Sequence, residues 1–530
     1  MTIAQYIANQ LYNNGIRYIY GIPGGPSIPY MEAFSSAGIE FILTSGESSA
    51  AIMASVSSRL TGIPGVCHAT FGPGATNLTT GTGCALLDRC PVLVLTSEMD
   101  DMMKDRTTQM NIDHQKLFDP LVKATFRMTP ENAEEVICNA LELCRQEYPG
   151  PVHIGLPSDL AHKEIKIKGL TATASNERII KNNISAAASL LRKTRKPLLA
   201  VGLTSLRFEI TEQLLEFLDS HRMPVLLTPM AKGILPESHP CYAGVLFHAL
   251  SNKLEGIISG TDLVIGLGYD PVEFNYESWM SDVPLLHFDT RETDMPLSIK
   301  NIQFVGYPGE WFKILNTMEP GLQFQGLSEL TDLHEEIASA FTRFTDHFGP
   351  VSAIKVLQEE LPPDVILTVD VGSHLHLAGQ YWKTHGKRNL IISNGWSGMG
   401  FGVPAALSAS IINRDATVVC ITGDGGFLMT AGEIITARRY NLPVIIVVFS
   451  DCELNLIKLK KSWQNLTPAG TLLYSGDLFG ADTFLGIKVI DADTEQSMRR
   501  AVKKSLLLKE PVIINARIDP DDYKWLIVRR

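Results

Sequence analysis

Short apolar runs alternate with amphipathic, helix-like segments along almost the whole chain. Most of these runs are continuous, and helical spacing of apolar residues follows between them. The predicted strands are YIYGI, FILTS, GVCHATF, PVLVLTS, VHIGLP, PLLAVG, PVLLTP, LVIGLG, LLHFD, VILTVD, LIISN, TVVCITGD, PVIIVVFS and PVIINARI. Continuous apolar strands separated by helices indicate parallel sheets that are covered on both faces. The pattern therefore predicts an α/β protein.

Two polar stretches interrupt this alternation and predict domain boundaries. Residues 166–183 (KIKGLTATASNERIIKNN) are rich in Lys, Thr and Asn, and residues 318–350 contain PGLQFQGLSEL followed by a helix. A chain of 530 residues is too long for one hydrophobic core. We therefore predict three doubly wound parallel-sheet domains, at residues 1–165, 184–340 and 350–530.

Composition and charge narrow the class of protein. The net charge is −11, which argues against nucleic acid or an anionic membrane as the main partner. None of the eight cysteines forms a CxxC pair, so buried, reduced thiols are expected. The first residues lack a basic region followed by a long apolar one, and no apolar run reaches membrane-spanning length. A cytoplasmic protein is expected.

Two acidic residues follow neighbouring predicted strands near the end of the chain. Asp424 ends TVVCITGD inside a Gly-Asp-Gly turn, and Asp451 follows the next strand after an intervening helix. In a parallel sheet this places both carboxylates at one edge, where ligands bind. Two carboxylates beside a glycine-rich turn suit Mg²⁺ and a phosphate group. Two helix-capping aspartates fit the spacing equally well, and both readings stay open on spacing alone.

The same segment resembles the thiamine-diphosphate (ThDP) motif, which begins with Gly-Asp-Gly and closes with Asn-Asn. By position the resemblance implies Asp424, Asp451 and the backbone carbonyl of Glu453 as metal ligands. The glycines of the cofactor turn are Gly423, Gly425 and Gly426. Ser450-Asp451 in place of Asn-Asn keeps an oxygen at the ligand position and adds a negative charge.

The first third of the chain resembles the acetohydroxyacid (acetolactate) synthase branch of the ThDP-dependent family. FILTSGESSAAIMA carries Glu47, which the resemblance implies is the catalytic carboxylate that activates the cofactor's aminopyrimidine ring. GPGATN implies a tight turn beside the cofactor with Asn77 as a capping or binding residue. The resemblance covers the first 165 and the last 180 residues, so the three predicted domains correspond to pyrimidine-binding, central and diphosphate-binding domains.

Two further motifs in the last domain resemble cofactor-binding segments. TVDVGSHLHLAGQYW matches the turn that contacts the diphosphate, through Gly372, Ser373 and His374. SNGWSGMGFGVPAALSA matches the run that holds the centre of the cofactor. Met399 is implied as the apolar wedge that bends the cofactor, with Ser397 bonding the pyrimidine edge through its carbonyl.

Substrate residues are implied less directly. The candidates are Thr70, Phe71, Gln109, Met110, His114 and Lys460. Phe71 stands where Ser or Thr is usual, and Lys460 stands where a pocket tryptophan is expected. In the central domain GLGYDPVEFNYESW departs from the pattern of FAD-binding members, which makes a bound FAD doubtful.

The resemblance implies an enzyme that uses ThDP and Mg²⁺ to decarboxylate a 2-oxo acid such as pyruvate. Ligation of the resulting carbanion to a second carbonyl would make it an acetolactate-synthase-like carboligase; the alternative is a 2-oxo acid decarboxylase or an acyloin lyase with a larger, aromatic substrate. A non-catalytic relative is disfavoured because Glu47 is present. A nicotinamide dehydrogenase lacks its G-x-G-x-x-G turn. The family also implies a homodimer or homotetramer with the active site at the chain interface.

Overall fold

The computed structural model describes most of the chain and divides it into two compact units. It leaves out residues 168, 170–183, 247, 275–278, 281–282, 296–299, 319–326, 343–346, 387 and 528–530. The first unit consists of residues 1–177, 395–418 and 427–444. The second consists of residues 178–394, 419–426 and 445–530. Most of the predicted linker at 166–183 lies outside the described residues.

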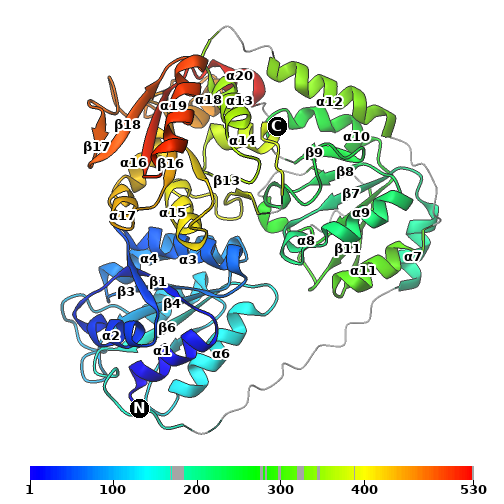
Figure 1. Cartoon of the computed structure of the whole chain (residues 1–530). Coiled ribbons are helices and arrows are strands. Elements are labelled where there is room, and N and C mark those ends of the chain that lie inside the picture. Colours follow the sequence, from blue (N-terminus) through cyan, green and yellow to red (C-terminus); the bar gives the residue numbers. More distant parts are fainter. Residues whose placement is uncertain are drawn as a thin grey trace. The chain divides into compact units, whose positions relative to one another are not determined.

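The first unit is built on a six-stranded parallel sheet in the order β2-β1-β3-β4-β6-β5. Its strands are β1 (Tyr18–Ile22), β2 (Glu40–Leu43), β3 (Gly65–Ala69), β4 (Val92–Glu98), β5 (Thr125–Arg127) and β6 (Pro151–Pro157). Its helices are α1 (Ile3–Asn13), α2 (Ile28–Ser36), α3 (Glu47–Thr61), α4 (Pro73–Leu87), α5 (His114–Phe118) and α6 (Ala133–Arg145). Figure 1 shows α1, α2 and α6 on one face of the sheet and α3 and α4 on the other. The continuous apolar strands are thus covered on both sides.

Local sequence sets where α1 and α3 begin and end. Thr2 caps α1, and its side chain and that of Gln5 form a capping box. Glu47 is the first residue of α3, where its negative charge favours the helix N-terminus. α3 ends at Gly62, which has a φ of 72° in the left-handed region and therefore favours glycine. α3 also packs tightly on β3, because a Cβ at Gly65 would lie 1.9 Å from the carbonyl oxygen of Ala54.

Two helices from the last third of the chain complete the first unit. They are α15 (Gly402–Ile412) and α17 (Glu433–Arg439). α15 packs on α3, where Ser408 Oγ donates a hydrogen bond to the carbonyl of Met53 at 2.7 Å. All but the last residue of α15 are buried, which explains why its sequence is apolar on every side.

The central part of the second unit contains a second six-stranded parallel sheet, in the order β12-β11-β10-β7-β8-β9. Its strands are β7 (Pro197–Val201), β8 (Val225–Leu227), β9 (Tyr242–Val245), β10 (Leu263–Leu267), β11 (Leu285–Asp289) and β12 (Asn301–Val305). Its helices are α7 (Ile184–Lys193), α8 (Leu203–Arg207), α9 (Thr211–Ser220), α10 (Glu255–Ser259), α11 (Pro308–Leu315) and α12 (Leu327–Thr342). Leu199 and Val201 face the cluster of α7, α9 and α11, whereas Leu198 and Ala200 face that of α10 and α12. Both faces are therefore buried.

The third sheet has seven strands in the order β14-β13-β15-β16-β19-β18-β17; the pairs β13–β14, β16–β19 and β18–β19 are parallel, and β17–β18 is antiparallel. Its strands are β13 (Ile366–Val369), β14 (Leu390–Ile391), β15 (Val418–Gly423), β16 (Val444–Ser450), β17 (Thr483–Phe484), β18 (Ile487–Ala492) and β19 (Val512–Arg517). The accompanying helices are α13 (Pro350–Glu360), α14 (Ser373–Tyr381), α16 (Asp424–Thr430), α18 (Asn455–Trp463), α19 (Glu495–Leu508) and α20 (Asp521–Leu526). β15 and β16 are neighbours, as the sequence predicted.

The predicted α/β class with three mainly parallel sheets is confirmed. All the predicted strands form, but the pattern missed β5, β9, β12, β17 and β18. These are two to six residues long, and four of the five are edge strands while β18 lies next to an edge strand, where apolar runs are weak. The exact domain boundaries remain a prediction. Among the described residues, no helix is both long and apolar enough to cross a membrane.

Candidate active site

Asp424 lies at the carboxyl end of β15 and is held by four hydrogen bonds. Its Oδ1 accepts from the N–H of Gly425 at 2.8 Å. Its Oδ2 accepts from the N–H of Cys452 at 2.7 Å, from the N–H of Asp451 at 3.2 Å and from the Tyr474 hydroxyl at 2.9 Å. The side chain is 2% exposed, so its orientation is fixed by these contacts.

Asp451 follows the neighbouring strand β16, and its carboxylate lies beside that of Asp424. Its Oδ1 accepts from the N–H of Glu453 at 3.1 Å and its Oδ2 from Asn455 Nδ2 at 3.1 Å. Burial and the negative charge of Asp424 raise the pKa of Asp451 to about 7. Two adjacent carboxylates, one buried and one partly buried, repel each other, and a bound cation would remove that repulsion.

A glycine-rich turn and buried polar atoms without hydrogen-bond partners lie at the same sheet edge. Ser373 and His374 form the start of α14 and are nearly fully buried. Within the described residues, neither Ser373 Oγ nor His374 Nε2 has a hydrogen-bond partner. A Cβ at Gly423 would lie 3.1 Å from the His374 ring, and one at Gly426 would lie 2.6 Å from Asp370 Oδ2. Buried polar atoms without partners beside side-chain-free backbone suit a polar ligand such as a phosphate.

Glu47 lies at the corresponding edge of the first sheet, in the other unit. It begins α3, is 9% exposed, and its Oε2 accepts from Asn77 Nδ2 at 3.1 Å. A Cβ at Gly74 would lie 3.4 Å from Glu47 Oε1, so the GPGATN turn passes directly over the carboxylate. The structure therefore brings together the two residues of this domain, Glu47 and Asn77, that the sequence predicted to act on a cofactor.

Comparison with known proteins identifies the family of the chain. Three family models match: the thiamine pyrophosphate enzyme N-terminal TPP binding domain at residues 1–117, the central domain at 184–315, and the C-terminal TPP binding domain at 370–516. Together these matches cover about three quarters of the chain. The chain belongs to the thiamine-diphosphate-dependent enzymes.

Relatives that match nearly the full length of this chain indicate to which branch of the family it is similar. The probable acetolactate synthase large subunit of Methanocaldococcus jannaschii is 29% identical, over 98% of this chain and 92% of its own. The acetolactate synthase isozyme 2 large subunit of Escherichia coli K12 is 28% identical over 100% and 97%, and the acetolactate synthase of Bacillus subtilis 168 is 26% identical over 98% and 93%. This is an acetolactate-synthase-like enzyme of the carboligase and decarboxylase type, and its cofactor is thiamine diphosphate with a divalent metal.

Three of the predicted substrate residues of this ThDP-dependent enzyme lie near Glu47 in the first unit. Thr70 and Phe71 follow β3, and a Cβ at Gly72 would lie 2.6 Å from the carbonyl oxygen of Met110. The segment that carries Met110 therefore packs on the turn that covers Glu47. Gln109, next to it, is exposed. These residues stay predictions as substrate contacts.

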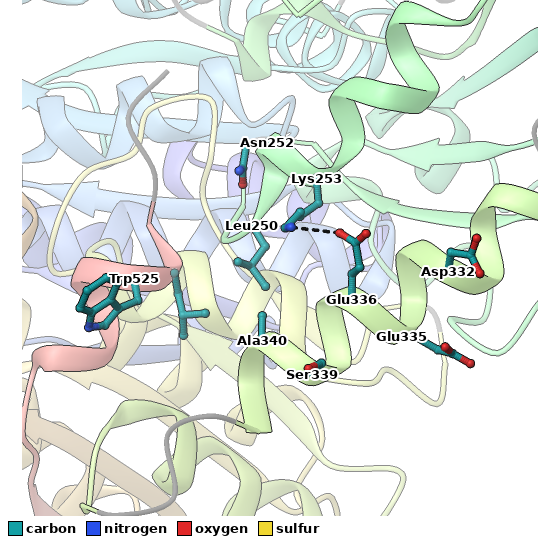
Figure 2. A pocket seen from close by; sticks show the side chains of 10 residues that line it. Leu250, Asn252, Lys253, Asp332, Glu335, Glu336, Ser339, Ala340 and Trp525 are labelled. Carbon is teal, nitrogen blue, oxygen red and sulfur yellow. Dashed lines mark hydrogen bonds and ion pairs between the residues drawn. The ribbon is translucent and has the colours of Figure 1, made fainter.

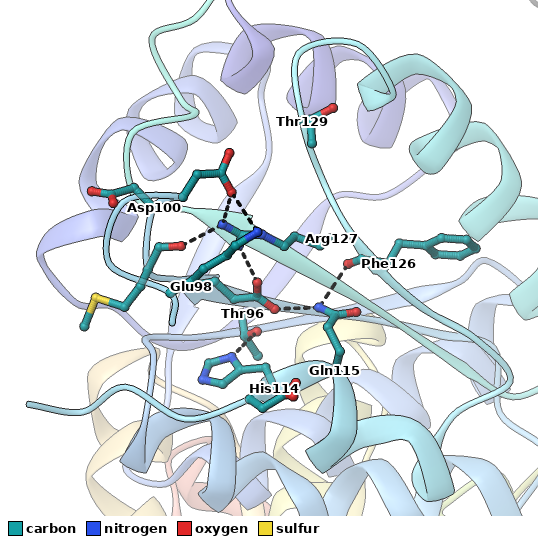
Figure 3. Close-up of polar contacts among 12 residues, drawn as sticks. Thr96, Glu98, Asp100, His114, Gln115, Phe126, Arg127 and Thr129 are labelled. Atoms are coloured by element: carbon teal, nitrogen blue, oxygen red, sulfur yellow. Dashed lines mark hydrogen bonds and ion pairs between the residues drawn. The ribbon is translucent and has the colours of Figure 1, made fainter. Parts of the chain in front are cut away.

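His114 and Lys460 lie in different surroundings. His114 is 2% exposed, and both of its ring nitrogens are in hydrogen bonds, Nε2 with the N–H of Gly72 at 3.2 Å and Nδ1 with Thr96 Oγ1 at 2.9 Å (Figure 3). It therefore has no free nitrogen for a substrate in this structure. Lys460 is exposed on α18 in the second unit.

Ser397 and Met399 fall in the first unit, in the segment that precedes α15. Ser397 has a φ of 52° and an exposed side chain, and Met399 is half-buried. The segment is anchored on α4, because the N–H of Gly395 donates to Asp88 Oδ1 at 3.0 Å. Trp396 packs directly over Gly83, where a Cβ would lie 2.6 Å from its ring. Their roles toward the cofactor stay predictions.

Sequence reasoning missed two residues that hold the site in place. Tyr474 bonds Asp424 from 50 positions further along the chain, in a polar loop that carries no recognisable signal. Glu433 of α17 accepts hydrogen bonds from the N–H groups of Ser45 at 3.0 Å and Gly46 at 2.9 Å, immediately before Glu47. It is 1% exposed, and burial raises its pKa.

A separate groove in the second unit contains none of the predicted residues. It has a volume of about 540 Å³ and lies between the turn before α10, helix α12 and helix α20 (Figure 2). The lining residues are Leu250, Asn252, Lys253, Asp332, Glu335, Glu336, Ser339, Ala340, Trp525 and Leu526. Its charged groups are partly engaged with one another, since Lys253 Nζ pairs with Glu336 Oε2 at 3.0 Å. It offers no arrangement of groups for catalysis.

Proposed function

We propose that this enzyme decarboxylates a 2-oxo acid similar to pyruvate and ligates the resulting acyl carbanion to a second carbonyl compound. The observation that carries the proposal is the pair of carboxylates, Asp424 and Asp451, at adjacent strand ends beside a glycine-rich turn. The full-length relatives are named as acetolactate synthases, which favours ligation over simple decarboxylation.

In this proposal Asp424, Asp451 and the backbone carbonyl of Glu453 bind Mg²⁺, and the turn with Gly423, Gly425 and Gly426 binds the diphosphate. Oxygen ligands from carboxylates and a carbonyl are those that Mg²⁺ prefers, together with phosphate oxygens. The fit is supported by the repulsion between the two carboxylates and by the absence of side chains at the glycines.

Gly372, Ser373 and His374 would contact the diphosphate from the start of α14. Their support is the two polar atoms, Ser373 Oγ and His374 Nε2, that have no partner within the described residues. Burial lowers the pKa of His374 to about 4 in the ligand-free protein. A neighbouring negative charge raises the pKa of an imidazole, so His374 could donate a proton in a hydrogen bond to a phosphate oxygen.

Glu47 would hold and move the proton that activates the cofactor. Asn77 orients its Oε2, and its Oε1 faces the GPGATN turn. When bound, thiamine diphosphate supplies a carbanion and an electron sink for the decarboxylation. Ser397, through its carbonyl, and Met399, through its apolar side chain, would position the cofactor's rings.

The substrate wall would come from the segments around Thr70, Phe71, Gln109 and Met110, with Lys460 contributing from α18. The family acts on small molecules as oligomers, and we propose a homodimer or homotetramer in which Glu47 serves the cofactor bound by another chain's third domain. A cytoplasmic location is supported by the eight cysteines, which all lie in the described part and form no disulfide. FAD stays doubtful as a further cofactor.

The test uses the purified enzyme with ThDP, Mg²⁺ and pyruvate, with release of CO₂, acetolactate and acetaldehyde followed by mass spectrometry. We expect acetolactate from the wild type and none from Glu47→Gln. CO₂ with acetaldehyde alone would favour the alternative, a 2-oxo acid decarboxylase. Turnover only with an aromatic 2-oxo acid or acyloin would favour a lyase. A protein that binds no ThDP at all would contradict the proposal.

A further inference from the structure

A continuous line of hydrogen-bonded side chains runs beneath the carboxyl end of the first sheet. It begins at the N–H of Gly72, in the turn over Glu47, and ends at Arg127 of β5. Its members are His114, Thr96, His153, Thr125, Gln115 and Glu98, which come from β4, α5, β5 and β6. Figure 3 shows His114 against Thr96, and Gln115 and Arg127 converging on Glu98. We call this line the Gly72–Arg127 network.

One end of the network fixes the direction of its hydrogen bonds. The N–H of Gly72 can only donate, so the Nε2 of His114, at 3.2 Å, must be the acceptor. A neutral imidazole with an unprotonated Nε2 carries its hydrogen on Nδ1. His114 Nδ1 lies 2.9 Å from Thr96 Oγ1 and therefore donates to it. Thr96 is then left with its own hydroxyl hydrogen to donate onward.

The remaining steps follow in the same direction. The Thr96 hydroxyl donates to His153 Nε2 at 2.8 Å, and His153 Nδ1 donates to Thr125 Oγ1 at 2.6 Å. Thr125 donates to Gln115 Oε1 at 2.7 Å, and Gln115 Nε2 donates to Glu98 Oε1 at 2.6 Å. Each histidine ring and each threonine hydroxyl of the line donates one bond and accepts one. Gln115 Nε2 also donates to the carbonyl of Phe126 at 3.5 Å, and the line ends on a carboxylate that accepts. Aligned hydrogen bonds of this kind polarise and strengthen one another.

Burial keeps the network in this single arrangement. Thr96 and His153 have no exposed surface. Burial lowers the pKa of His114 to about 4 and that of His153 well below its usual value, so both rings are neutral at physiological pH. Arg127 Nη1 lies 2.7 Å from Glu98 Oε2 and balances the one negative charge at the end of the line.

Three members of the network could also be viewed as metal ligands. Atoms of Glu98, His114 and His153 lie within 4.8 Å of one another. However, both nitrogens of each histidine are engaged in hydrogen bonds, and Glu98 pairs with both Arg127 and Gln115. A metal would have to displace Thr96 from between the two rings. The geometry is that of a satisfied polar network.

The network connects the parts of the chain that surround Glu47. At one end it holds Gly72, whose φ of 63° and close contact with Met110 leave no room for a side chain. At the other end Arg127 Nη2 donates to the carbonyl of Met99 at 3.0 Å and to Asp101 Oδ1 at 2.9 Å. Met99 and Asp101 begin the segment that ends with Met110, so the network contacts both ends of that segment.

We propose that the Gly72–Arg127 network positions the Phe71–Gly72 turn and residues 99–113 as the substrate-facing wall beside Glu47. His114 acts through the N–H of Gly72 and does not touch the substrate; it is a positioning residue. The role in substrate selection rests on the proposed function, whereas the network's hydrogen-bond direction does not.

The test breaks the network in the middle with Thr96→Val, which keeps the side-chain shape and removes the hydroxyl. His114 then loses its acceptor and His153 its donor. We expect kcat/KM for the 2-oxo acid to fall about tenfold or more while ThDP affinity changes less than about twofold, because the residues proposed to bind Mg²⁺ and the diphosphate belong to the second unit. Thr96→Ser restores the hydroxyl and should recover activity. Thr261→Val, which removes another buried hydroxyl bonded to a carbonyl in the second unit, is the matched control and should leave kcat/KM unchanged.

Two measurements on the ligand-free protein separate this inference from the proposed function. ¹⁵N-histidine NMR should show His114 and His153 as neutral Nδ1–H tautomers in the wild type. Hydrogen exchange should show faster exchange of the Gly72 amide in Thr96→Val. If these hold but no 2-oxo acid is turned over, the positioning network stands and the substrate assignment fails.

Three results would overturn the inference. The first is a His114 ring protonated on Nε2, which reverses the direction of the line. The second is a stoichiometric metal in the purified wild type, measured by elemental analysis, that is lost in His153→Gln. The third is a Thr96→Val enzyme with wild-type kcat/KM and wild-type exchange at Gly72.

Discussion

Glu433 is expected to hold the turn that precedes Glu47, and replacing it by alanine tests this directly. Its Oε1 accepts from the N–H groups of both Ser45 and Gly46, and its Oε2 accepts from the Thr436 hydroxyl at 2.7 Å. Glu433→Ala leaves these two backbone N–H groups, whose hydrogen bonds are part-buried, without their acceptor. Glu433→Gln keeps an oxygen for them and removes the charge.

The expected loss of stability of the turn follows from the two backbone N–H groups that lose their acceptor. Losing a part-buried hydrogen bond to a carboxyl group costs about 1 kcal/mol or more, so Glu433→Ala should destabilise the turn by about 2 kcal/mol or more. Each 1.4 kcal/mol is a factor of ten, so the lower bound corresponds to about 30-fold faster local opening. Glu433→Gln should cost much less, because burial raises the pKa of Glu433 and the amide avoids the burial of a charge.

The folding stability of the wild type and that of Glu433→Gln should depend differently on pH. Because the pKa of the Glu433 carboxyl is raised in the folded protein, the folded state binds a proton that the unfolded state has already released. The resulting stability is present at low pH and is lost as pH rises through the folded pKa. Glu433→Gln cannot titrate, so its stability relative to the wild type should improve as pH rises.

Hydrogen exchange read by mass spectrometry on peptides spanning residues 41–50 measures the opening of the turn. We expect Glu433→Ala to exchange at Ser45 and Gly46 at least about 30-fold faster than the wild type, and Glu433→Gln to stay close to the wild type. Glu329→Ala, at an exposed position of α12, is the control. Unchanged exchange and unchanged turnover in Glu433→Ala would refute the positioning argument.

Three other outcomes are expected. Tyr474→Phe removes one hydrogen bond to Asp424, so the Mg²⁺ concentration for half-maximal activity should rise about tenfold or more, with full activity at high Mg²⁺. An unchanged Mg²⁺ titration would argue against Tyr474 as a residue that orients Asp424. Chelation of the metal should release ThDP, measured by gel filtration, and added Mg²⁺ should restore binding; retention of ThDP without metal would contradict the ligand assignment. Burial raises the pKa of Asp289 to about 7, so the unfolding free energy should fall by roughly 1.4 kcal/mol per pH unit as pH rises from about 4 to 7. Urea unfolding of Asp289→Asn should lack this slope. An equal slope in both proteins would show that Asp289 does not cause the pH dependence.

The sequence was most informative where candidate functional residues follow a strongly apolar strand. Asp424 and Asp451 follow fully apolar runs, so their meeting at one sheet edge could be predicted from topology alone. Glu47 and Asn77 came from motif resemblance, and the structure places them in contact.

The sequence was least informative where a side chain acts across a large separation. Tyr474 reaches Asp424 over 50 residues, and Glu433 reaches Ser45 over 388. Neither contact leaves a local pattern, because it depends on how elements pack and not on spacing within one element. His114 stays a prediction as a substrate residue, and the sequence did not show that both of its ring nitrogens bond to the protein.

The first unit is built from three separate segments of the chain, and this affects how it folds during synthesis on the ribosome. Eleven of the fifteen residues of α3 are buried, and α15, which packs on this helix, belongs to a later part of the chain. The unit is complete only at residue 444, some 270 residues after the end of its first segment at 177. At about 5–20 residues per second this is a delay of roughly 13–50 s. During that time the nascent chain exposes the small-residue face of α3, so this is the interval in which a chaperone would be needed.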